Sequence, residues 1–256
     1  MRVCNIQFEL NGRSKEDNVS YMMGLVDQVE DADLINLPEI WSTGYFNFDE
    51  YKKNAEAIDG DLVTCFKEKA KAKNCYILMG SFVEKLNEEY FNTSVLISHQ
   101  GEVVGCYRKI HLFGYESKEA SILTKGSEST VISTPWGKVG LATCYDLRFP
   151  ELFRKMSEQG AVIFLVVSAW PLARLEAWRL FCQARAHENL AYLISCNCAG
   201  KDQEIELAGH SMVVDPMGEI LRESKEIEEV VNINLDINNG LKIRDTFPAL
   251  NDRQIF

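Results

Sequence analysis

Residues 139–154 read VGLATCYDLRFPELFR, and they join a continuous apolar run to an amphipathic one. The apolar run, 139–143, is typical of a buried strand, and Pro150 stands where proline is favoured, near the first turn of a helix. Cys144 therefore lies on a strand-to-helix turn, where backbone N–H groups and the positive end of the helix dipole face its thiol. Such a setting favours a thiolate and offers donors to an oxyanion, although a buried cysteine without a chemical role is the alternative.

Composition limits the class of the chain and its partners. The 256 residues are 46% hydrophobic and 25% charged, as in an ordinary globular protein, and the net charge is −11. No basic block is present to neutralise phosphates, so nucleic acid is not an expected partner. The longest apolar stretch, 161–169, is too short to span a membrane, so no membrane association is predicted.

Eight cysteines are present, and none forms a C-x-x-C pair. Because the chain starts at Met1 with no secretory signal, we expect free thiols in a reducing cytoplasm. Cys196 and Cys198 are too close together to form a metal site without further ligands, and the four histidines have no metal-ligand spacing. The sequence thus predicts neither a disulfide framework nor a metal site.

Strand-like and helix-like segments alternate along the chain. The expected strands cover 1–8, 34–37, 75–83, 92–98, 103–108, 130–134, 138–143, 162–168, 192–197, 210–214 and 230–235. The expected helices cover 14–31, 62–73, 150–159 and 174–189. Continuous apolar strands and hairpins occur together, so the pattern predicts an α/β protein with mixed sheets covered by helices in one domain. Two sheets packed face to face with helices outside would accommodate this number of buried strands.

A carboxylate, an ammonium group and a thiol each follow the end of an expected strand, as Glu39, Lys109 and Cys144. Either charged residue taken alone is more often a solvated surface charge. Together they are the groups that amide hydrolysis through a thioester requires. The carboxylate takes the thiol proton, the sulfur attacks the carbonyl carbon, and the cation stabilises the developing oxyanion.

His111 is a second candidate base, as in a cysteine protease. It lies between Ile110 and Leu112, where a histidine is more often structural, and no Asn or Asp is marked as its orienting partner. Glu39 is therefore the expected base for Cys144.

Several ordered motifs together resemble the nitrilase, or carbon–nitrogen hydrolase, superfamily. They are Pro38-Glu39, YRKIHLF at 107–113, CYDLRFPEL at 144–152, ARAHEN at 184–189, GHSMVVDPMGE at 209–219 and the late Phe247-Pro248. Ordered motifs with matching flanks are far more specific than one short pattern, and the resemblance covers nearly the whole chain. It implies one carbon–nitrogen hydrolase domain over residues 1–256, with a four-layer α-β-β-α sandwich fold.

The resemblance also implies the catalytic residues. Glu39 would be the general base, Lys109 the cation that stabilises the oxyanion and Cys144 the nucleophile, with the backbone N–H of Tyr145 completing the oxyanion hole. The family has a second glutamate that orients the triad and the substrate, and Glu116 is its best match. Neither a metal nor an organic cofactor is implied.

The motif CYDLRFPE looks like that of the ω-amidase branch, which acts on ω-amides of dicarboxylic acids such as 2-oxoglutaramate. A substrate of this kind carries a carboxylate, for which Arg148, Tyr45 and Arg174 are candidate ligands. Trp170 would form a wall of the pocket, and Tyr145 stands where nitrilases and carbamoylputrescine amidases usually carry tryptophan.

Several alternatives stay open. Arg148 could brace the turn at Asp146, and Trp170 could pack in the core. Deaminated glutathione or an N-carbamoyl compound would be an alternative substrate for the same chemistry. A catalytically silent binding protein would have no need for the complete triad, and a redox-active thiol protein would need a partner cysteine that the sequence does not mark.

The resemblance implies a homodimer, because relatives commonly dimerise through helices and C-terminal segments. It also draws attention to His187, which replaces the aliphatic residue common at that place in the helix motif. We expect His187 to affect packing beneath the site rather than catalysis.

Overall fold

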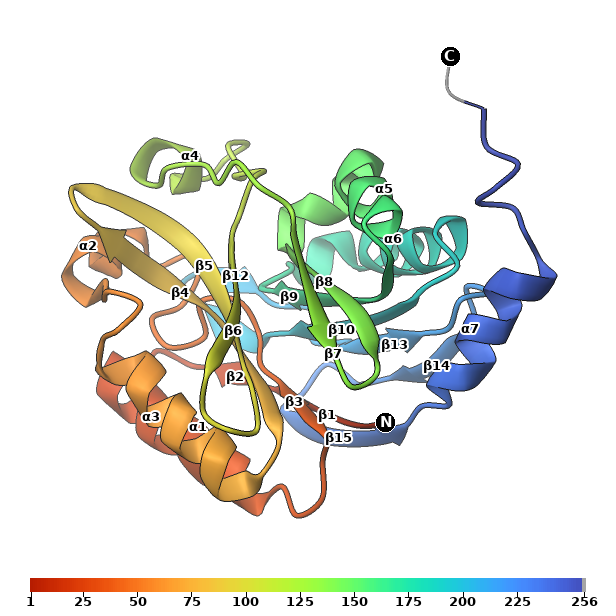
Figure 1. The fold of residues 1–256 in the computed structure, drawn as a ribbon. Helices are drawn as coiled ribbons and strands as arrows, with labels where there is room; N and C mark the ends of the chain where they lie inside the picture. The colour runs from red at the N-terminus through yellow and green to blue at the C-terminus, as the bar shows by residue number, and fades with distance from the viewer. Residues whose placement is uncertain (255–256) are drawn as a thin grey trace.

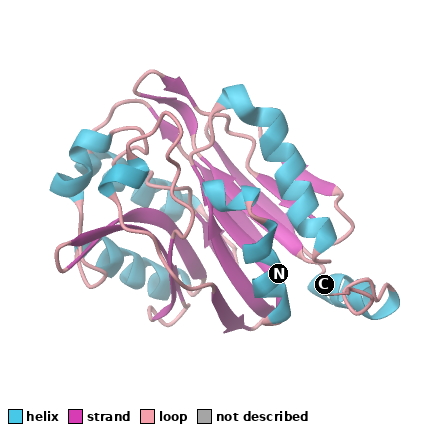
Figure 2. Ribbon diagram, turned by 90° about the horizontal axis from the view of Figure 1, so that it is seen from above, coloured by secondary structure: helices cyan, strands magenta, loops and turns pink. Residues whose placement is uncertain are grey.

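Two six-stranded sheets lie face to face between helices in the computed structural model, which describes residues 1–254 (Figure 1). Helices α1 (Lys15–Gln28) and α3 (Asp61–Lys73) cover the first sheet, and α5 (Pro150–Glu158) and α6 (Leu175–Glu188) cover the second. Seen from above, the strands occupy the middle of the molecule and helices lie on both sides of them (Figure 2). The predicted four-layer α-β-β-α sandwich is therefore confirmed.

The first sheet has the strand order β15-β1-β3-β4-β5-β6. Its strands are β1 (Arg2–Gln7), β3 (Leu34–Asn36), β4 (Tyr76–Leu86), β5 (Glu89–Ile97), β6 (Val103–Arg108) and β15 (Glu229–Asn234). β1, β3 and β4 are parallel, and the other neighbours pair antiparallel. All six strands were predicted, although β4 and β5 extend further into their hairpin than expected.

The second sheet has the strand order β14-β13-β10-β9-β8-β7. Its strands are β7 (Thr130–Thr134), β8 (Gly137–Thr143), β9 (Ala161–Ser168), β10 (Tyr192–Asn197), β13 (Met212–Val214) and β14 (Ile220–Glu223). Only β14 was not predicted. Three of its four residues are exposed, so it has no buried face to produce an alternating pattern.

Several short elements were also missed. They are the third sheet, made of β2 (Glu9–Leu10), β11 (Ala199–Asp202) and β12 (Ile205–Glu206), and the helices α2 (Tyr51–Asn54), α4 (Glu119–Ile122) and α7 (Ile237–Thr246). β11 pairs in parallel with β2, so its formation depends on residues at the opposite end of the chain. Apart from the ten-residue α7, these segments have two to four residues, too few for a period to be recognised.

Alternate residues of the central strands pack into two separate hydrophobic clusters. Leu34 and Leu78 pack with residues of the second sheet, whereas Ile35 and Ile77 pack with residues of α1 and α3. A strand that is covered on both faces needs apolar side chains at every position. This explains why these strands appear in the sequence as continuous apolar runs.

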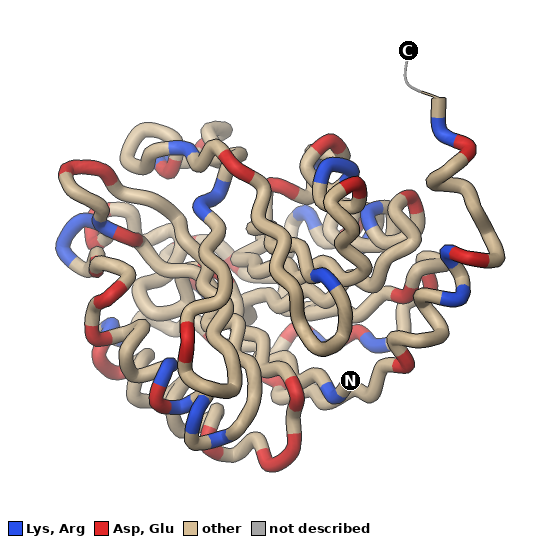
Figure 3. Tube along the Cα trace, viewed as in Figure 1, with Lys and Arg blue, Asp and Glu red and all other residues tan. Residues whose placement is uncertain are grey.

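Charged groups of both signs are interspersed over the surface (Figure 3). Many of their ion pairs are exposed, such as that between Lys53 and Glu50, and solvent screening makes such pairs weak contributors to stability. Across residues 1–254, no helix combines the length and apolar character needed to cross a bilayer.

Candidate active site

Glu39, Lys109 and Cys144 come together although they follow strands of different sheets. Glu39 follows β3 and Lys109 follows β6 in the first sheet, whereas Cys144 directly follows β8 in the second. The Glu39 N–H donates to the carbonyl of Ser168 at the end of β9, at 3.3 Å, and its Oε2 accepts from the Ala169 N–H at 3.0 Å. The glutamate is therefore held by both sheets.

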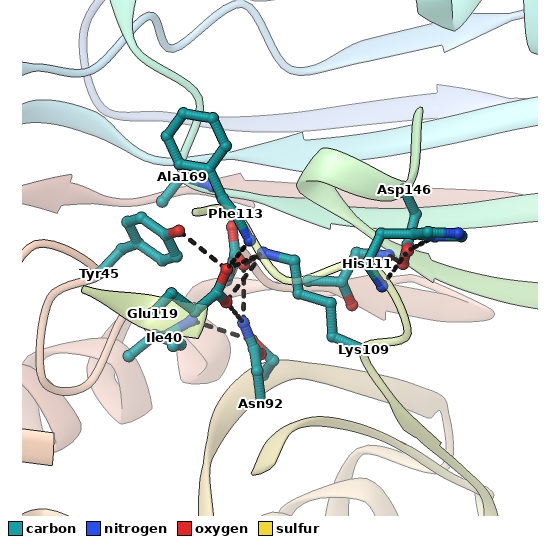
Figure 4. Close-up of polar contacts among 12 residues, drawn as sticks. Ile40, Tyr45, Asn92, Lys109, His111, Phe113, Glu119, Asp146 and Ala169 are labelled. Atoms are coloured by element: carbon teal, nitrogen blue, oxygen red, sulfur yellow. Dashed lines mark hydrogen bonds and ion pairs between the residues drawn. The ribbon is translucent and has the colours of Figure 1, made fainter. Parts of the chain in front are cut away.

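Lys109 ends in a closed cluster of charged and polar side chains (Figure 4). Its Nζ lies 2.9 Å from Glu39 Oε1, 2.9 Å from Glu119 Oε1 and 3.0 Å from Glu119 Oε2, and all three side chains are fully buried. Asn92 donates from Nδ2 to both carboxylates, at 2.8 Å to Glu39 and 3.0 Å to Glu119. A buried ammonium group tends to lose its proton, and two carboxylates this close keep it charged.

Glu119 occupies the place that the sequence assigned to Glu116. Glu116 is exposed, has a left-handed backbone with φ of +53°, and lines an outer groove, so it does not reach the lysine. Glu119 begins α4, and its Oε2 accepts from the Tyr45 hydroxyl at 3.0 Å and from the Phe113 N–H at 2.7 Å. The loop after Lys109 turns back, and this path brings the first residue of α4 to the cluster.

Sequence reasoning missed both Glu119 and Asn92. The segment EASIL at 119–123 does place a carboxylate before apolar residues at the start of a short helix, a position that the helix dipole favours. Asn92 carries no comparable signal, because it begins a segment that has the pattern of an ordinary strand. Only long-range packing identifies it.

Cys144 has a left-handed backbone conformation with φ of +46°. This conformation costs a residue with a Cβ atom about 1–2 kcal/mol, so neighbouring contacts must stabilise the turn. The Thr143 N–H donates to Asp146 Oδ2 at 2.8 Å, which holds the two ends of the turn together. The buried Asp146 carboxylate also accepts from the Tyr107 hydroxyl at 2.7 Å and from the His111 N–H at 3.2 Å. It thereby ties the turn of the thiol to the segment that carries the lysine.

His111 packs against this turn. Its Nδ1 lies 2.7 Å from Asp146 Oδ1, and its ring stacks on Phe149 with centroids 3.8 Å apart and an interplanar angle of 9°. The sequence marked no acidic partner for His111, and the structure supplies Asp146. Within residues 1–254 no hydrogen bond joins His111 to Cys144, so the geometry favours the structural interpretation of this histidine.

The protonation states differ from the expectation of a resting thiolate. Burial raises the pKa of the Cys144 thiol well above its usual value, and the charge of Glu39 raises it further, although Lys109 opposes this. Burial also raises the pKa of Glu39, against the opposing effect of Lys109. Burial lowers the pKa of Lys109, but the charges of Glu119 and Glu39 outweigh burial and raise that pKa well above its usual value. The site therefore combines a protonated thiol, a carboxylate of increased basicity and a charged ammonium group.

A small pocket opens beside Cys144. All four residues predicted to contact substrate line it, namely Tyr45, Tyr145, Arg148 and Trp170. The other walls are Phe46, Phe113, Ala169, Pro171 and Arg174. The thiol therefore lies in a narrow pocket between aromatic and cationic side chains.

Two arginines on this pocket have no carboxylate partner in the described part of the chain. The Arg148 guanidinium lies 5.4 Å from the ring centre of Trp170 and does not brace Asp146, which is occupied by other donors. Arg174 lies 5.1 Å from the ring centre of Phe113. Aromatic faces hold both cations in place while leaving their N–H groups available to an anion.

His187 does not lie beneath the site as expected. The His187 side chain is exposed and lies against the turn between β13 and β14. A Cβ atom placed on Gly218 of that turn would lie 3.2 Å from the Cβ of His187. Within residues 1–254, no group of three or more His, Cys, Asp or Glu side chains is arranged to hold a metal ion.

Comparison with known proteins places this geometry in a family. A family model described as carbon–nitrogen hydrolase matches residues 3–242. The chain is 38% identical to a 2-oxoglutaramate amidase from Paenarthrobacter nicotinovorans, over 93% of this chain and 84% of that protein. It is 32% identical to a deaminated glutathione amidase from Dictyostelium discoideum, over 94% and 90%. Among solved structures, it resembles a CN-hydrolase superfamily protein from Xanthomonas campestris that carries an arsenic adduct in its active site, with a TM-score of 0.93, 28% identity and coverage of 100% and 98%.

Proposed function

Because the chain belongs to the carbon–nitrogen hydrolase family, whose members hydrolyse non-peptide C–N bonds, we propose that its substrate is a small ω-amido acid such as 2-oxoglutaramate. The observation that carries this proposal is that Cys144 and the unpaired Arg148 and Arg174 line one small pocket. An ω-amido acid has a reactive carbonyl carbon at one end and a carboxylate at the other, so it needs a nucleophile and a cation within one pocket. The 2-oxoglutaramate amidase of Paenarthrobacter nicotinovorans supports this choice.

The first half of the reaction forms a thioester. Glu39 accepts the thiol proton as Cys144 Sγ attacks the amide carbon, and the raised pKa values of both groups favour transfer during the attack rather than before it. Lys109 Nζ and the backbone N–H of Tyr145 stabilise the oxyanion. Protonated Glu39 then passes its proton to the leaving nitrogen, which departs as ammonia.

The second half hydrolyses the thioester. Glu39 removes a proton from water as the water oxygen attacks the thioester carbon, and the same cation and N–H stabilise the second oxyanion. Collapse of this intermediate expels the Cys144 sulfur, which takes the proton back from Glu39, and the dicarboxylic acid is released. Glu119 and Asn92 hold the side chains of Lys109 and Glu39 in position during both halves of the reaction.

A second candidate substrate is an N-substituted ω-amide such as deaminated glutathione. An outer groove continues from the pocket and shares Phe46, Phe113, Pro171 and Arg174 with it. A leaving group larger than ammonia could occupy this groove while the acyl part occupies the pocket. The deaminated glutathione amidase of Dictyostelium discoideum supports this second candidate.

Turnover of a panel of amides by the wild type and Cys144→Ala tests the proposal. The panel contains 2-oxoglutaramate, deaminated glutathione, N-carbamoylputrescine and a simple nitrile, with released ammonia or amine as the readout. Rapid turnover of 2-oxoglutaramate that is lost in the variant is expected. If the wild type hydrolyses no ω-amide although Cys144 reacts with iodoacetamide, the proposal fails and a different amide becomes the better candidate. A thiol that also fails to react would indicate a silent binding protein.

We also propose that the protein is a homodimer in a reducing cytoplasm. Leu180 on the outer helix α6 is 63% exposed, and all eight cysteines are free thiols. The dimer is what the family resemblance implies, and Leu180 lies on a helix of the outer layer through which copies could meet. Light scattering should therefore give twice the 29.1 kDa of one chain and a lower mass for Leu180→Glu. A wild type that has the mass of one chain would exclude the dimer.

A further inference from the structure

The Asp202 carboxylate lies directly behind one wall of the pocket. Asp202 is the last residue of β11 and is 5% exposed. Its Oδ2 accepts a hydrogen bond from the Phe46 N–H at 2.7 Å. Gly44 has φ of +89°, and a Cβ there would lie 2.7 Å from Asp202 Oδ1, so glycine permits this close approach.

The segment that Asp202 holds is directly connected to the reacting groups. The Gly44 N–H donates to the carbonyl of Ile40 at 2.8 Å, and Ile40 follows Glu39 in the chain. At the other end of the segment, the Tyr45 hydroxyl donates to Glu119 Oε2 at 3.0 Å. A shift in the backbone of this segment would therefore move a donor on the carboxylate that holds the lysine.

Asp202 reaches this segment from a separate part of the fold. β11 pairs with β12 to form a hairpin, and it pairs with β2 on its other edge. Residues of this hairpin, Lys201 and 204–206, line the outer groove that continues from the pocket. One carboxylate thus connects the hairpin of the outer groove to the wall of the inner pocket.

We propose that Asp202 is a positioning residue for the reaction, whose ionised carboxylate holds Tyr45 and Phe46 on the pocket wall and thereby keeps Glu119 against Lys109. The kinetic test of this role rests on the proposed function, because it uses the proposed amide substrate. Asp202 Oδ2 accepts from Phe46, and Oδ1 faces Gly44 in the same segment. A neutral isostere removes the charge from this acceptor and places an N–H₂ group where one of the two oxygens lies.

The charge of this carboxylate changes near neutral pH. Burial raises the pKa of Asp202 to about 6, although the backbone N–H groups of Phe46 and Tyr45 oppose this. Lys201 and Glu204 on the same hairpin pair with each other at 3.0 Å. Burial raises the pKa of Tyr45 and of the nearby Cys198 well above their usual values, so both face Asp202 uncharged. Below about pH 6, Asp202 therefore takes up a proton and one of its oxygens becomes a donor.

The variant Asp202→Asn imitates the protonated form at every pH. We expect its kcat/KM for 2-oxoglutaramate at neutral pH to fall about tenfold or more, mainly through kcat, because one hydrogen bond to a charged group is lost. The difference from the wild type should vanish below about pH 6, where the wild type is itself protonated. Tyr45→Phe in the Asp202→Asn background should cost less than Tyr45→Phe alone, since both changes act on the same contact.

Asp215→Asn is the matched control. Asp215 Oδ1 also accepts from backbone N–H groups, those of Met217 at 2.8 Å and Glu219 at 2.9 Å, but in the turn between β13 and β14. This variant should keep the wild-type kcat, KM and pH profile. A loss of activity as large as that of Asp202→Asn would show that any disturbed turn has this effect, and would overturn the proposal.

Alkylation of Cys144 by iodoacetamide provides a readout that needs no amide substrate. If the wild type hydrolyses no ω-amide, the proposed function fails, while slower alkylation of Asp202→Asn at neutral pH that converges with the wild type below about pH 6 still supports the role of Asp202. The proposal is overturned if Asp202→Asn folds and matches the wild type in both rates across this range. It is also overturned if the effects of Asp202→Asn and Tyr45→Phe are simply additive.

Discussion

Replacement of Glu119 by Gln removes one negative charge from the centre of the site with almost no change in side-chain size. The carboxylate accepts hydrogen bonds from Lys109 Nζ, the Asn92 amide, the Tyr45 hydroxyl and the Phe113 N–H. An amide has one acceptor oxygen with two lone pairs, so at most two of these donors keep an acceptor. The donors that lose this acceptor are buried, and only Lys109 and Asn92 keep Glu39 as another partner, so both the folded state and the transition state are destabilised.

The size of the effect depends on the partners that Lys109 retains. Removing one member of a buried ion pair costs about 3–5 kcal/mol when it leaves a charge unpaired. Lys109 keeps Glu39 at 2.9 Å, so the lower figure of about 3 kcal/mol applies. Because about 1.36 kcal/mol corresponds to a tenfold change in rate, we expect kcat/KM of Glu119→Gln to fall about 100-fold.

Steady-state hydrolysis of the amide as a function of pH measures this loss and a second signature. The charge of Glu119 raises the pKa of Glu39, so its removal lowers that pKa and moves the acidic limb of the kcat/KM profile to lower pH. Glu116→Gln removes an exposed carboxylate three residues earlier in the chain and should leave the rate and the profile unchanged. Wild-type behaviour of Glu119→Gln, or an equal loss in Glu116→Gln, would refute the assignment of Glu119.

Three further results are expected. Arg148→Met should raise KM for an ω-amido acid at least about tenfold and barely affect an uncharged amide such as butyramide; equal losses for both would argue against a carboxylate contact. Asp146→Asn should lower Tm by about 4–8 °C, since a loss of about 2 kcal/mol in a chain of this size shifts Tm by about 2–4 °C per kcal/mol; an unchanged melting curve would contradict its role in holding the turn of Cys144. Asp202 has a pKa of about 6 in the folded protein, above that of an unfolded aspartate, so the folded state binds its proton more tightly and wild-type stability falls as pH rises towards 6. The Tm of Asp202→Asn should not show this fall in stability with rising pH. A difference in Tm between the two proteins that does not vary with pH would be evidence against the raised pKa of Asp202.

Local periodicity was sufficient to predict eleven of the twelve strands of the two main sheets, whereas their four-layer arrangement was implied by the family resemblance. Segments such as 34–37 and 192–197 are apolar at nearly every position because both faces of their strands are covered, and this pattern is visible in neighbouring residues. The pairing of β2 with β11 could not be predicted, because it joins Glu9 to Ala199 through segments too short to show a period. The exposed strand β14 lacked a pattern for a different reason, since neither of its faces is buried.

The sequence by itself determined which chemistry the chain carries, because Glu39, Lys109 and Cys144 each follow a buried strand within a recognisable motif. Only the tertiary structure decided that Glu119 rather than Glu116 meets the lysine, since the path of the intervening loop selects between two carboxylates three residues apart. It also decided the proton affinity of the thiol. The helix dipole is a local property and favours a thiolate, but burial beside Glu39 raises the pKa of the thiol, because desolvation and charge interactions depend on distances between residues that are far apart in the chain.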